Sequence, residues 1–370
     1  MLIEVFFICN ENFHFLPNFE VNKFYTARLS DENAAKKYGA GILNIPSNYQ
    51  SGYAKSLLKL SGVKNPRPNL KDLDPVYEAT NNRSKMPADL RVKLRLTPPN
   101  ENVLVYDVEY SINAFGRRKV TNQSQKLNAH RYLLALGDSY TFGQGVTSGM
   151  DYPSQLAKKL SDNYFVYNFG KPGFAPNDLL FRFQNGIESL DEITQEEGVA
   201  VWYFIEAHLE RFICGFYCYH HSFDLYVSAK PKYRMIENEL KYVGNLADTM
   251  TSIDKFLYYS AQIKTLQFAE NLLFADYADV DLRAFVESLK KVKAYLEEKK
   301  NLKKFYFLHS HNFHQQNRIT QLLNEAGIDV INASDLPIKN LQDMKIPFDG
   351  HPSSDYYWLI SEVVKKVIEP

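Results

Sequence analysis

From about residue 129 to the C-terminus, the sequence predicts an α/β fold whose parallel sheet is covered by helices on both faces. Short runs that are almost entirely apolar alternate with segments of helical periodicity, and a glycine or polar residues follow several of the runs. Strands that are apolar on both faces are typical of a parallel sheet with helical crossovers. Such sheets bind ligands at the carboxyl ends of their strands, so the residues that follow each strand are the candidates for a site.

The expected strands and helices of this region alternate along the chain. An apolar run at 132–136 ends at Gly137 and predicts the first strand, and later runs predict strands at 165–169, 199–205, 305–308 and 329–332. Apolar residues at helical spacing predict helices at about 152–161, 177–189, 282–300, 316–326 and 354–368. This alternation implies right-handed crossovers between neighbouring parallel strands.

The first part of the chain, residues 1–128, has a different character. It is rich in Asn, Pro and short apolar runs without a helical period, and prolines between residues 66 and 99 break its middle into loops. The best strand is expected at 103–111, with another at 5–7 and helices near 30–37 and 53–60. We therefore expect an irregular, partly β extension attached to an α/β domain over residues 129–370.

The composition argues against several classes of protein. The 370 residues are 45% hydrophobic and 23% charged, which excludes intrinsic disorder for most of the chain. Because 43 basic side chains balance 43 acidic ones, non-specific binding to nucleic acids or anionic membranes is disfavoured. No stretch approaches 18 consecutive apolar residues, and the N-terminal segment, with Glu4 and no basic n-region, is a poor signal peptide. We expect a soluble chain, with its compartment and oligomeric state left open.

Cysteines and aromatic residues carry weaker signals. The three cysteines, Cys9, Cys214 and Cys218, are too few for a disulfide scaffold, and we expect free thiols rather than a disulfide or metal pair. Aromatic residues make up 14% of the chain, and many gather in an insert at about 209–282 after the third expected strand. They include Phe212, Phe216, Tyr217, Tyr219, Phe223 and Tyr226. The insert should overhang the site, where it either lines the pocket or forms a packing subdomain.

A glycine-bounded segment, Gly137-Asp138-Ser139-Tyr140-Thr141-Phe142-Gly143, follows the first expected strand. Glycines permit a sharp turn from strand to helix, and backbone N–H groups at the start of the helix can hold an oxyanion. In that case Ser139 is a nucleophile. Alternatively, Asp138 or Ser139 only caps the helix. The residues of the segment by themselves leave both interpretations open.

This segment resembles the nucleophile block of the SGNH (GDSL) hydrolase family. The resemblance implies a flavodoxin-like α/β/α fold and a Ser139 nucleophile that works with a histidine base near the C-terminus. The second block of the family is an Asn followed five residues later by a Gly, and Asn168 and Gly173 match it after the second expected strand. The resemblance therefore implies that the backbone N–H groups of Ser139 and Gly173 stabilise an oxyanion.

The last block of the family, Asp-x-x-His-Pro ahead of the final helix, appears in a shortened form. The sequence Asp349-Gly350-His351-Pro352 has its Asp two residues before the His instead of three. The resemblance implies that His351 is the general base and that Asp349 orients its imidazole. The shorter spacing leaves a Ser–His dyad open as an alternative to the full triad.

The third block of the family, usually an Asn after the third strand, is altered in this chain. No Asn follows the strand, and His208 falls at the corresponding position by counting from the strand. His208 either donates to the oxyanion or caps the strand end. Arg211 either clamps a substrate carboxylate or phosphate or forms a structural ion pair. We include Arg211, with the two neighbours of Ser139, Asp138 and Tyr140, among the expected substrate contacts.

Two further patterns receive separate interpretations. The stretch 106–117, with Asn113 and Gly116, weakly resembles a segment that often precedes the nucleophile strand in bacterial SGNH-like proteins. It implies an N-terminal strand packed against the catalytic domain. The histidines His309, His311 and His314 have metal-like spacing but lack nearby carboxylates or cysteines, so we expect no metal site and no cofactor.

Taken with the resemblance, these residues predict a serine esterase that acts on a small-molecule or glycan ester, without a nucleic-acid partner. One alternative is a carbohydrate O-acetyltransferase or deacetylase acting on a cell-surface glycan, suggested by the aromatic insert and the leading extension. Another is a non-catalytic binding protein on a degenerate hydrolase scaffold, suggested by the missing Asn and the short final block. The acyl group and the alcohol of the substrate are not specified by the sequence.

Overall fold

The structure is a computed structural model that describes residues 90–96, 106–214, 230–246, 248–260, 277–334, 336, 344–346 and 349–370. The strand expected at 5–7 and the helices expected near 30–37 and 53–60 lie outside these residues, as do five of the six aromatic residues named for the insert. The proposed boundary between an extension and an α/β domain stays a prediction.

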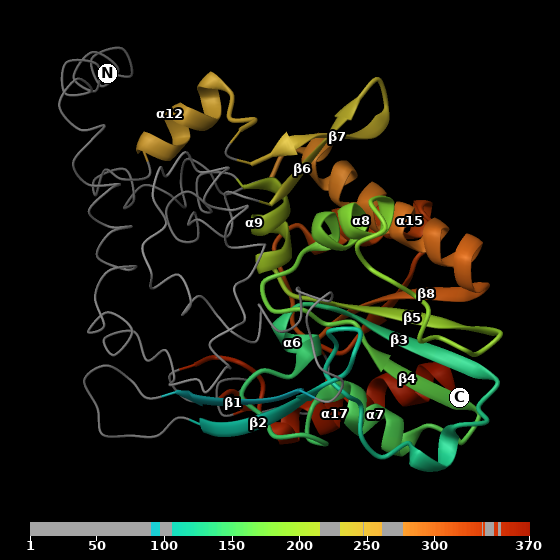
Figure 1. Cartoon of the computed structure of the whole chain (residues 1–370). Helices are drawn as coiled ribbons and strands as arrows, with labels where there is room; N and C mark the ends of the chain where they lie inside the picture. Colours follow the sequence, from blue (N-terminus) through green and yellow to red (C-terminus); the bar gives the residue numbers. More distant parts are fainter. Residues whose placement is uncertain are drawn as a thin grey trace.

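A five-stranded parallel sheet forms the centre of the described structure (Figure 1). Its strands are β3 (Arg131–Gly137), β4 (Tyr164–Asn168), β5 (Glu197–Phe204), β8 (Leu302–His309) and β9 (Asp329–Asn332). They lie in the order β4-β3-β5-β8-β9, so the first strand along the chain lies between the second and the third. This is the flavodoxin-like order, and its switch point falls between β3 and β5. The predicted α/β fold with a parallel sheet is confirmed.

Helices cover both faces of the sheet, as the apolar strands predict (Figure 1). One face packs on α7 (Tyr152–Lys159) and α17 (Ser354–Ile368). The other packs on α8 (Pro176–Gln184), α9 (Ala207–Ile213), α15 (Asp279–Lys300) and α16 (Gln316–Glu325). Successive residues of β3 serve the two faces in turn, since Leu134 belongs to the core with α8 and α15 while Leu133 belongs to the core with α7 and α17. The sheet is therefore the middle of three layers.

Most expected bounds agree with the structure to within a few residues, and α8 is the main exception. The helix expected to reach residue 189 ends at Gln184, with Asn185 as its C-cap. Gly186 follows with φ 63°, the left-handed conformation that commonly ends a helix. The residues beyond it form a loop whose acidic side chains pack behind the site described below.

An antiparallel pair of strands lies beside the sheet. It consists of β1 (Leu90–Leu96) and β2 (Tyr106–Ile112), of which β1 was not expected from the sequence. Tyr110 and Ile112 of β2 are fully buried in the core that also holds Phe142, and the Tyr110 hydroxyl accepts a hydrogen bond from the backbone N–H of Gly145 at 2.8 Å. The 106–117 segment thus packs against the α/β layers, as its resemblance implied. A short 3-10 helix, η3 (Ser124–Lys126), follows it.

The described part of the insert packs on the outer helices. A hairpin of β6 (Pro231–Ile236) and β7 (Glu239–Asn245) is followed by α12 (Ser252–Ser260). The sequence analysis missed this hairpin, whose turn residues Glu237 and Asn238 both have positive φ, a backbone suited to Asn in tight hairpins. Tyr233 of β6 is buried beside α8 and α15 and donates its hydroxyl to Gln184 at 2.6 Å. This portion therefore forms a packing subdomain.

Three further findings concern the described residues as a set. None of their helices has both the length and the apolar composition to cross a bilayer. No group of three or more potential metal ligands occurs among them. Cys214, which caps the end of α9, is disulfide-bonded, so the expectation of a free thiol is wrong for this residue.

Candidate active site

The turn after β3 leads into a short helix, α6 (Ser139–Phe142). Gly137 ends the strand with φ 144°, and a Cβ there would collide with the side chain of Thr141 and lie 2.9 Å from the Tyr203 carbonyl oxygen. Asp138 is the N-cap of α6, because its Oδ1 accepts a hydrogen bond from the backbone N–H of Tyr140 at 3.0 Å. Capping by Asp138 and a reactive position for Ser139 are therefore compatible.

Ser139, His351 and Asp349 form a continuous hydrogen-bonded chain. The Oγ of Ser139 lies 2.9 Å from Nε2 of His351, and Nδ1 of His351 lies 2.6 Å from Oδ2 of Asp349. A carboxylate can only accept, so Nδ1 carries the proton and Nε2 is left to accept the hydroxyl proton of Ser139. The side chains of His351 and Asp349 are 17% and 9% exposed, so both are largely shielded from water.

A tight turn explains how an Asp two residues before the His reaches its ring. Gly350 between them has φ 82°, and its backbone N–H donates to the Ile346 carbonyl at 2.9 Å. The Ile346 N–H donates in turn to the His351 carbonyl at 2.7 Å, so both ends of the turn are tied. The final helix starts directly afterwards, with Ser353 as its N-cap. The shortened block therefore still presents the carboxylate to Nδ1.

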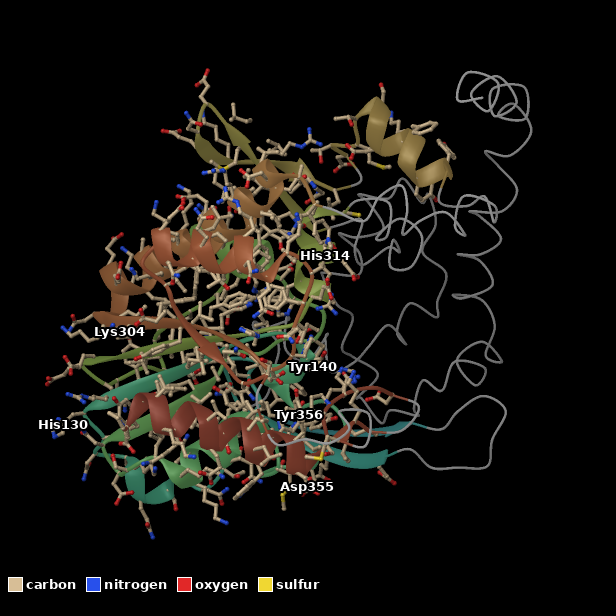
Figure 2. All side chains as sticks on the ribbon, turned by 180° about the vertical axis from the view of Figure 1, so that it is seen from behind. His130, Tyr140, Lys304, His314, Asp355 and Tyr356 are labelled. Carbon is tan, nitrogen blue, oxygen red and sulfur yellow. The ribbon has the colours of Figure 1, made fainter. Side chains whose placement is uncertain are left out.

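Tyr140 of α6 contacts this turn. Its hydroxyl donates to the Gly350 carbonyl at 3.1 Å, and its ring lies 5.5 Å from the His351 ring, centroid to centroid. Tyr140 and Tyr356 lie at the same end of the sheet (Figure 2). Tyr140 remains half-buried, and the role that the structure shows for it is to brace the His351 turn.

The loop after β4 packs directly against α6. Asn168 accepts a hydrogen bond from the Gly170 N–H at 2.9 Å and donates its amide to the carbonyls of Thr141 and Phe142 at 3.3 Å each. The backbone N–H of Lys171 donates to the Gly137 carbonyl at 3.1 Å. The two loops that the sequence matched to separate family blocks are therefore joined by several hydrogen bonds.

Gly173 lies further along the same loop, with φ 75°. It is half-exposed, whereas its neighbours Pro172 and Phe174 are buried. Within the part of the chain that the structure describes, no hydrogen bond involves its backbone N–H. A half-exposed backbone hydrogen-bond donor of this kind fits the expected contact with an oxyanion.

His208 does not occupy the position expected of an oxyanion donor. It is fully buried, and its Nδ1 accepts a hydrogen bond from Nε1 of Trp202 at 3.2 Å. Indole N–H only donates, so the proton of the His208 ring lies on Nε2, which faces Oδ2 of Asp138 at 3.4 Å. Burial lowers the pKa of His208 despite the opposing charge of Asp138, which favours the neutral ring. The expectation of an oxyanion role is not supported by this geometry, because the His208 ring is fully buried and its Nε2 lies beside a buried carboxylate.

Arg211 and Asp138 form a structural ion pair, the alternative that the sequence left open for Arg211. Nη1 of Arg211 donates to Oδ2 of Asp138 at 2.6 Å and to the Phe174 carbonyl at 3.2 Å. Burial alone would raise the pKa of Asp138, but His208 and the Arg211 charge outweigh it and hold this pKa well below its ordinary value. Asp138 is fully buried. The expectation that Asp138 and Arg211 contact substrate is therefore not supported by the geometry.

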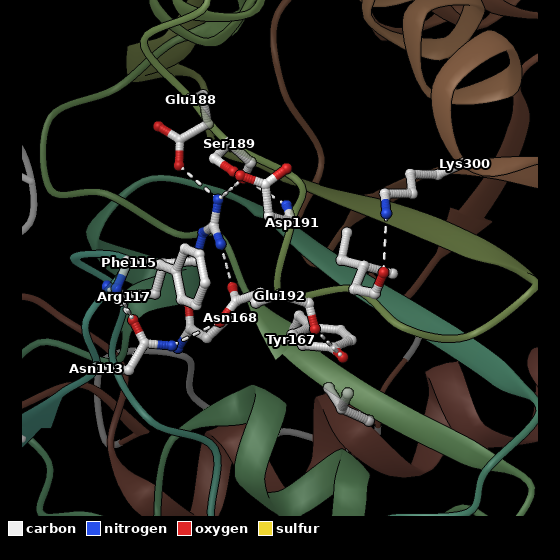
Figure 3. Close-up of polar contacts among 12 residues, drawn as sticks. Asn113, Phe115, Arg117, Tyr167, Asn168, Glu188, Ser189, Asp191, Glu192 and Lys300 are labelled. Carbon is white, nitrogen blue, oxygen red and sulfur yellow. Dashed lines mark hydrogen bonds and ion pairs between the residues drawn. The ribbon is translucent and has the colours of Figure 1, made fainter. Parts of the chain in front are cut away.

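Two buried arginines that follow β2, Arg117 and Arg118, contact the residues around the site, and the sequence analysis assigned neither of them a role. Arg117 lies over the Phe169 ring at 3.6 Å and pairs with Glu188 and Glu192 (Figure 3). Arg118 donates to the carbonyls of Phe142, the last residue of α6, and of Val146, four residues further on, at 3.2 and 2.9 Å. A cation at carbonyls that end a helix is favourable. The weak resemblance over 106–117 was the available signal for Arg117, and Arg118 lies one residue beyond it.

Comparisons with known proteins give matches only among solved structures. No family model matches the chain, and no curated protein matches it. Among solved structures, a member of the lipolytic G-D-S-L family from Veillonella parvula DSM 2008 aligns with 11% identity and a TM-score of 0.34, over 64% of this chain and 97% of that one. An acetyl xylan esterase from the rumen bacterium Butyrivibrio proteoclasticus aligns with 10% identity and a TM-score of 0.38.

A family two carbohydrate esterase from Clostridium thermocellum, solved with cellohexaose, aligns with 11% identity and a TM-score of 0.37. This chain spans 63% of the length of the acetyl xylan esterase and 64% of that of the Clostridium esterase. All three similar proteins are described as esterases or as lipolytic-family members. At identities of 10–11%, the reaction of this chain has to be argued from its own residues.

Proposed function

We propose that the protein is a serine-dependent hydrolase of ester bonds. The observation that carries the proposal is the chain of hydrogen bonds from Ser139 Oγ through His351 to Asp349, at 2.9 and 2.6 Å. These side chains come from two segments about 210 residues apart, and they meet at the carboxyl end of β3 beside the switch point of the sheet. Parallel sheets of this order place ligands there.

The first half-reaction forms an acyl-enzyme. As Ser139 Oγ attacks the ester carbonyl, His351 Nε2 takes the hydroxyl proton and then returns it to the departing alcohol. Asp349 stabilises the imidazolium and keeps Nδ1 protonated. The oxyanion accepts hydrogen bonds from the backbone N–H groups of Ser139 and Gly173. No side chain of β5 or α9 is assigned to it. In the second half-reaction water attacks the acyl group with His351 as the base.

A fluorophosphonate probe tests the nucleophile directly. We expect it to add to Ser139 in the wild-type protein, with the adduct located by mass spectrometry of peptides, and to leave Ser139→Ala unlabelled. Ser148→Ala is the matched control, because the Ser148 hydroxyl donates to the Glu109 carbonyl and faces no base. Folded wild-type protein that stays unlabelled, or labelling that survives Ser139→Ala, would contradict the proposal.

The acceptor in the second step decides between hydrolysis and transfer. Water yields a carboxylic acid, whereas a sugar hydroxyl yields an O-acylated glycan from the same acyl-enzyme. Release of acid from p-nitrophenyl esters of increasing chain length, measured with and without added oligosaccharides, separates the two reactions. We expect acid release to dominate; acylated oligosaccharide as the main product would establish the transferase alternative.

The non-catalytic alternative rested on the missing Asn and the short final block, and a serine far from its base would have strengthened it. Ser139 Oγ lies instead 2.9 Å from His351 Nε2, and the hydrogen bond to Asp349 orients the ring as a working base requires, which supports catalysis. We therefore rank catalysis above simple binding. Absence of turnover with every ester tested, in protein that the fluorophosphonate labels, would restore the binding interpretation.

A further inference from the structure

Arg211 connects the two loops that carry the oxyanion donors. The same nitrogen, Nη1, donates to Asp138 beside the nucleophile and to the carbonyl of Phe174, the residue after Gly173. Asp138 is itself tied to the nucleophile helix by the N–H of Tyr140 at 3.0 Å. One buried carboxylate and one guanidinium therefore link the turn after β3 to the loop after β4.

This link holds the side of the loop that follows Gly173. On the side before Gly173, the Lys171 N–H is bonded to the Gly137 carbonyl at 3.1 Å, and the Phe174 N–H closes a turn on the Lys171 carbonyl at 3.0 Å. The bond from Arg211 to the Phe174 carbonyl lies beyond the glycine, at 3.2 Å. Gly173 has a φ of 75°, in the left-handed region that favours glycine. Its backbone is thus held by hydrogen bonds on both sides.

The position of this glycine matters more here than in a site with a side-chain donor. His208 and Arg211 of α9 are three residues apart and both face Asp138, so this part of the helix is committed to the carboxylate. The proposed oxyanion site then rests on two backbone N–H groups from two different loops. A displacement of about 1 Å in such an arrangement can cost up to about 10²-fold in rate.

We propose that Arg211 is a positioning residue, whose bridge from Asp138 to the Phe174 carbonyl fixes the Gly173 N–H relative to Ser139; the role in catalysis rests on the proposed esterase function. Arg211 does not touch the substrate in this account. It acts on the transition state through the loop, so its loss lowers kcat and leaves KM nearly unchanged.

The test compares Arg211→Met and Arg211→Lys with wild type, using kcat and KM for a p-nitrophenyl ester and hydrogen–deuterium exchange of peptides over 169–175. Arg131→Gln is the matched control, since Arg131 pairs with Glu197 at the opposite end of β3. We expect Arg211→Met to lower kcat about 10- to 100-fold with KM within about threefold, and to speed exchange of the loop. Arg211→Lys should recover part of the kcat, and Arg131→Gln should change neither quantity.

A double variant keeps the test decisive if Arg211→Met fails to fold. Asp138→Asn combined with Arg211→Met removes the buried charge together with its partner, so folding no longer depends on the pair. We expect the double variant to keep the low kcat, because the bond to the Phe174 carbonyl is still lost. Recovery of wild-type kcat, or unchanged loop exchange, would overturn the role of Arg211.

Failure of the proposed function gives a different result. It appears as wild-type protein without labelling or turnover, whereas failure of the inference appears as normal kcat in an Arg211 variant of an active enzyme. Loop exchange needs no activity and tests the bridge in either case. Unchanged exchange in Arg211→Met would overturn the bridge even in an inactive protein.

Discussion

The spacing of Asp349 and His351 shows how a backbone conformation can compensate for a missing residue. Asp349 stands two residues before His351, and the turn through Gly350 at φ 82° brings its Oδ2 to 2.6 Å from Nδ1. A residue with a Cβ pays roughly 1–2 kcal/mol to adopt a left-handed conformation, so a glycine suits this position. The contact itself favours the complete triad over the dyad that the sequence left open.

Asp349→Asn tests whether the third member contributes to the reaction. We expect kcat to fall by about 10³- to 10⁴-fold with little change in fold, because an amide can hold the imidazole in the wrong tautomer. The measurement is kcat for a p-nitrophenyl ester beside a thermal unfolding curve. Asp355→Asn in the first turn of α17 is the control. A loss smaller than about tenfold would instead establish a Ser–His dyad.

At the scale of elements, the loop after β4 is shaped by how closely it approaches α6. A Cβ built on Gly170 would overlap the backbone N of Phe142 and lie 2.7 Å from the carbonyl carbon of Thr141. Backbone atoms of a helix cannot move aside as a flexible side chain can. The glycine therefore lets the loop lie against α6. The same close approach lets Asn168 reach the carbonyls of Thr141 and Phe142.

Gly170→Ala should separate the loop from α6. We expect a loss of about 1–3 kcal/mol in the free energy of unfolding, with a fall in kcat because Gly173 moves with the loop. The control is Gly186→Ala, where no atom lies within 4 Å of the added Cβ and only the φ of 63° causes strain. Urea unfolding of both variants decides the point. Wild-type stability together with full activity in Gly170→Ala would contradict the contact.

The edge strand β4 is protected by a side chain. Nε2 of Gln123 donates to the Val166 carbonyl and its Oε1 accepts from the Val166 N–H, both at 3.0 Å. A side-chain amide thus imitates the backbone of a neighbouring strand. Unpaired groups on an edge strand can pair with another chain, so Gln123 removes one such site from the sheet edge.

Gln123→Ala should leave both backbone groups of Val166 without this partner. We expect a destabilisation of about 1–3 kcal/mol and increased self-association at high concentration. Urea unfolding measures the first effect and sedimentation velocity the second. Gln125→Ala, at an exposed position two residues along, should change neither. A Gln123→Ala variant that matches Gln125→Ala in both assays would rule out the protective role.

At the scale of the whole molecule, a buried cluster of charges joins the residues that follow β2 to the loop after β4. Glu188 pairs with Arg117 at 2.8 Å, with Arg182 at 2.8 Å and with Lys171 at 3.3 Å. Burial lowers the pKa of Lys171 to about 7, with Glu188 opposing the shift. The cations outweigh burial at Glu188 and hold its pKa below the ordinary value. The cluster therefore makes stability depend on pH through Lys171.

Lys171→Met tests this dependence. The lysine has a folded pKa of about 7 and an unfolded pKa of 10.5, so the unfolded chain binds more protons between these values and stability rises with pH across the window. The free energy of unfolding of the wild type, relative to Lys171→Met, should therefore rise by roughly 1 kcal/mol per pH unit above pH 7. Urea titrations at pH 7.5, 8.5 and 9.5 measure it. A flat or falling difference would exclude a buried lysine that loses its proton.

Periodicity and local chemistry predicted much of the fold. The bounds of β9 and α17 were predicted to the residue, since a short apolar run or an amphipathic stripe is a local property. The strand β1 and the hairpin of β6 and β7 were missed, because antiparallel pairs outside the main sheet are stabilised by partners that a single segment does not reveal. The end of α8 at Gln184 was overlooked, although Gly186 two residues later carried the signal.

The sequence by itself determined the alternation of strands and helices and the polar residues that follow the strands, because both depend on neighbours within a few positions. Only the tertiary structure decided that His208 and Arg211 face Asp138 rather than a substrate. Strand order and helix crossing set which side chains of distant segments meet. Burial then fixes the partner of each polar group, because a carboxylate without water must be met by the donors around it.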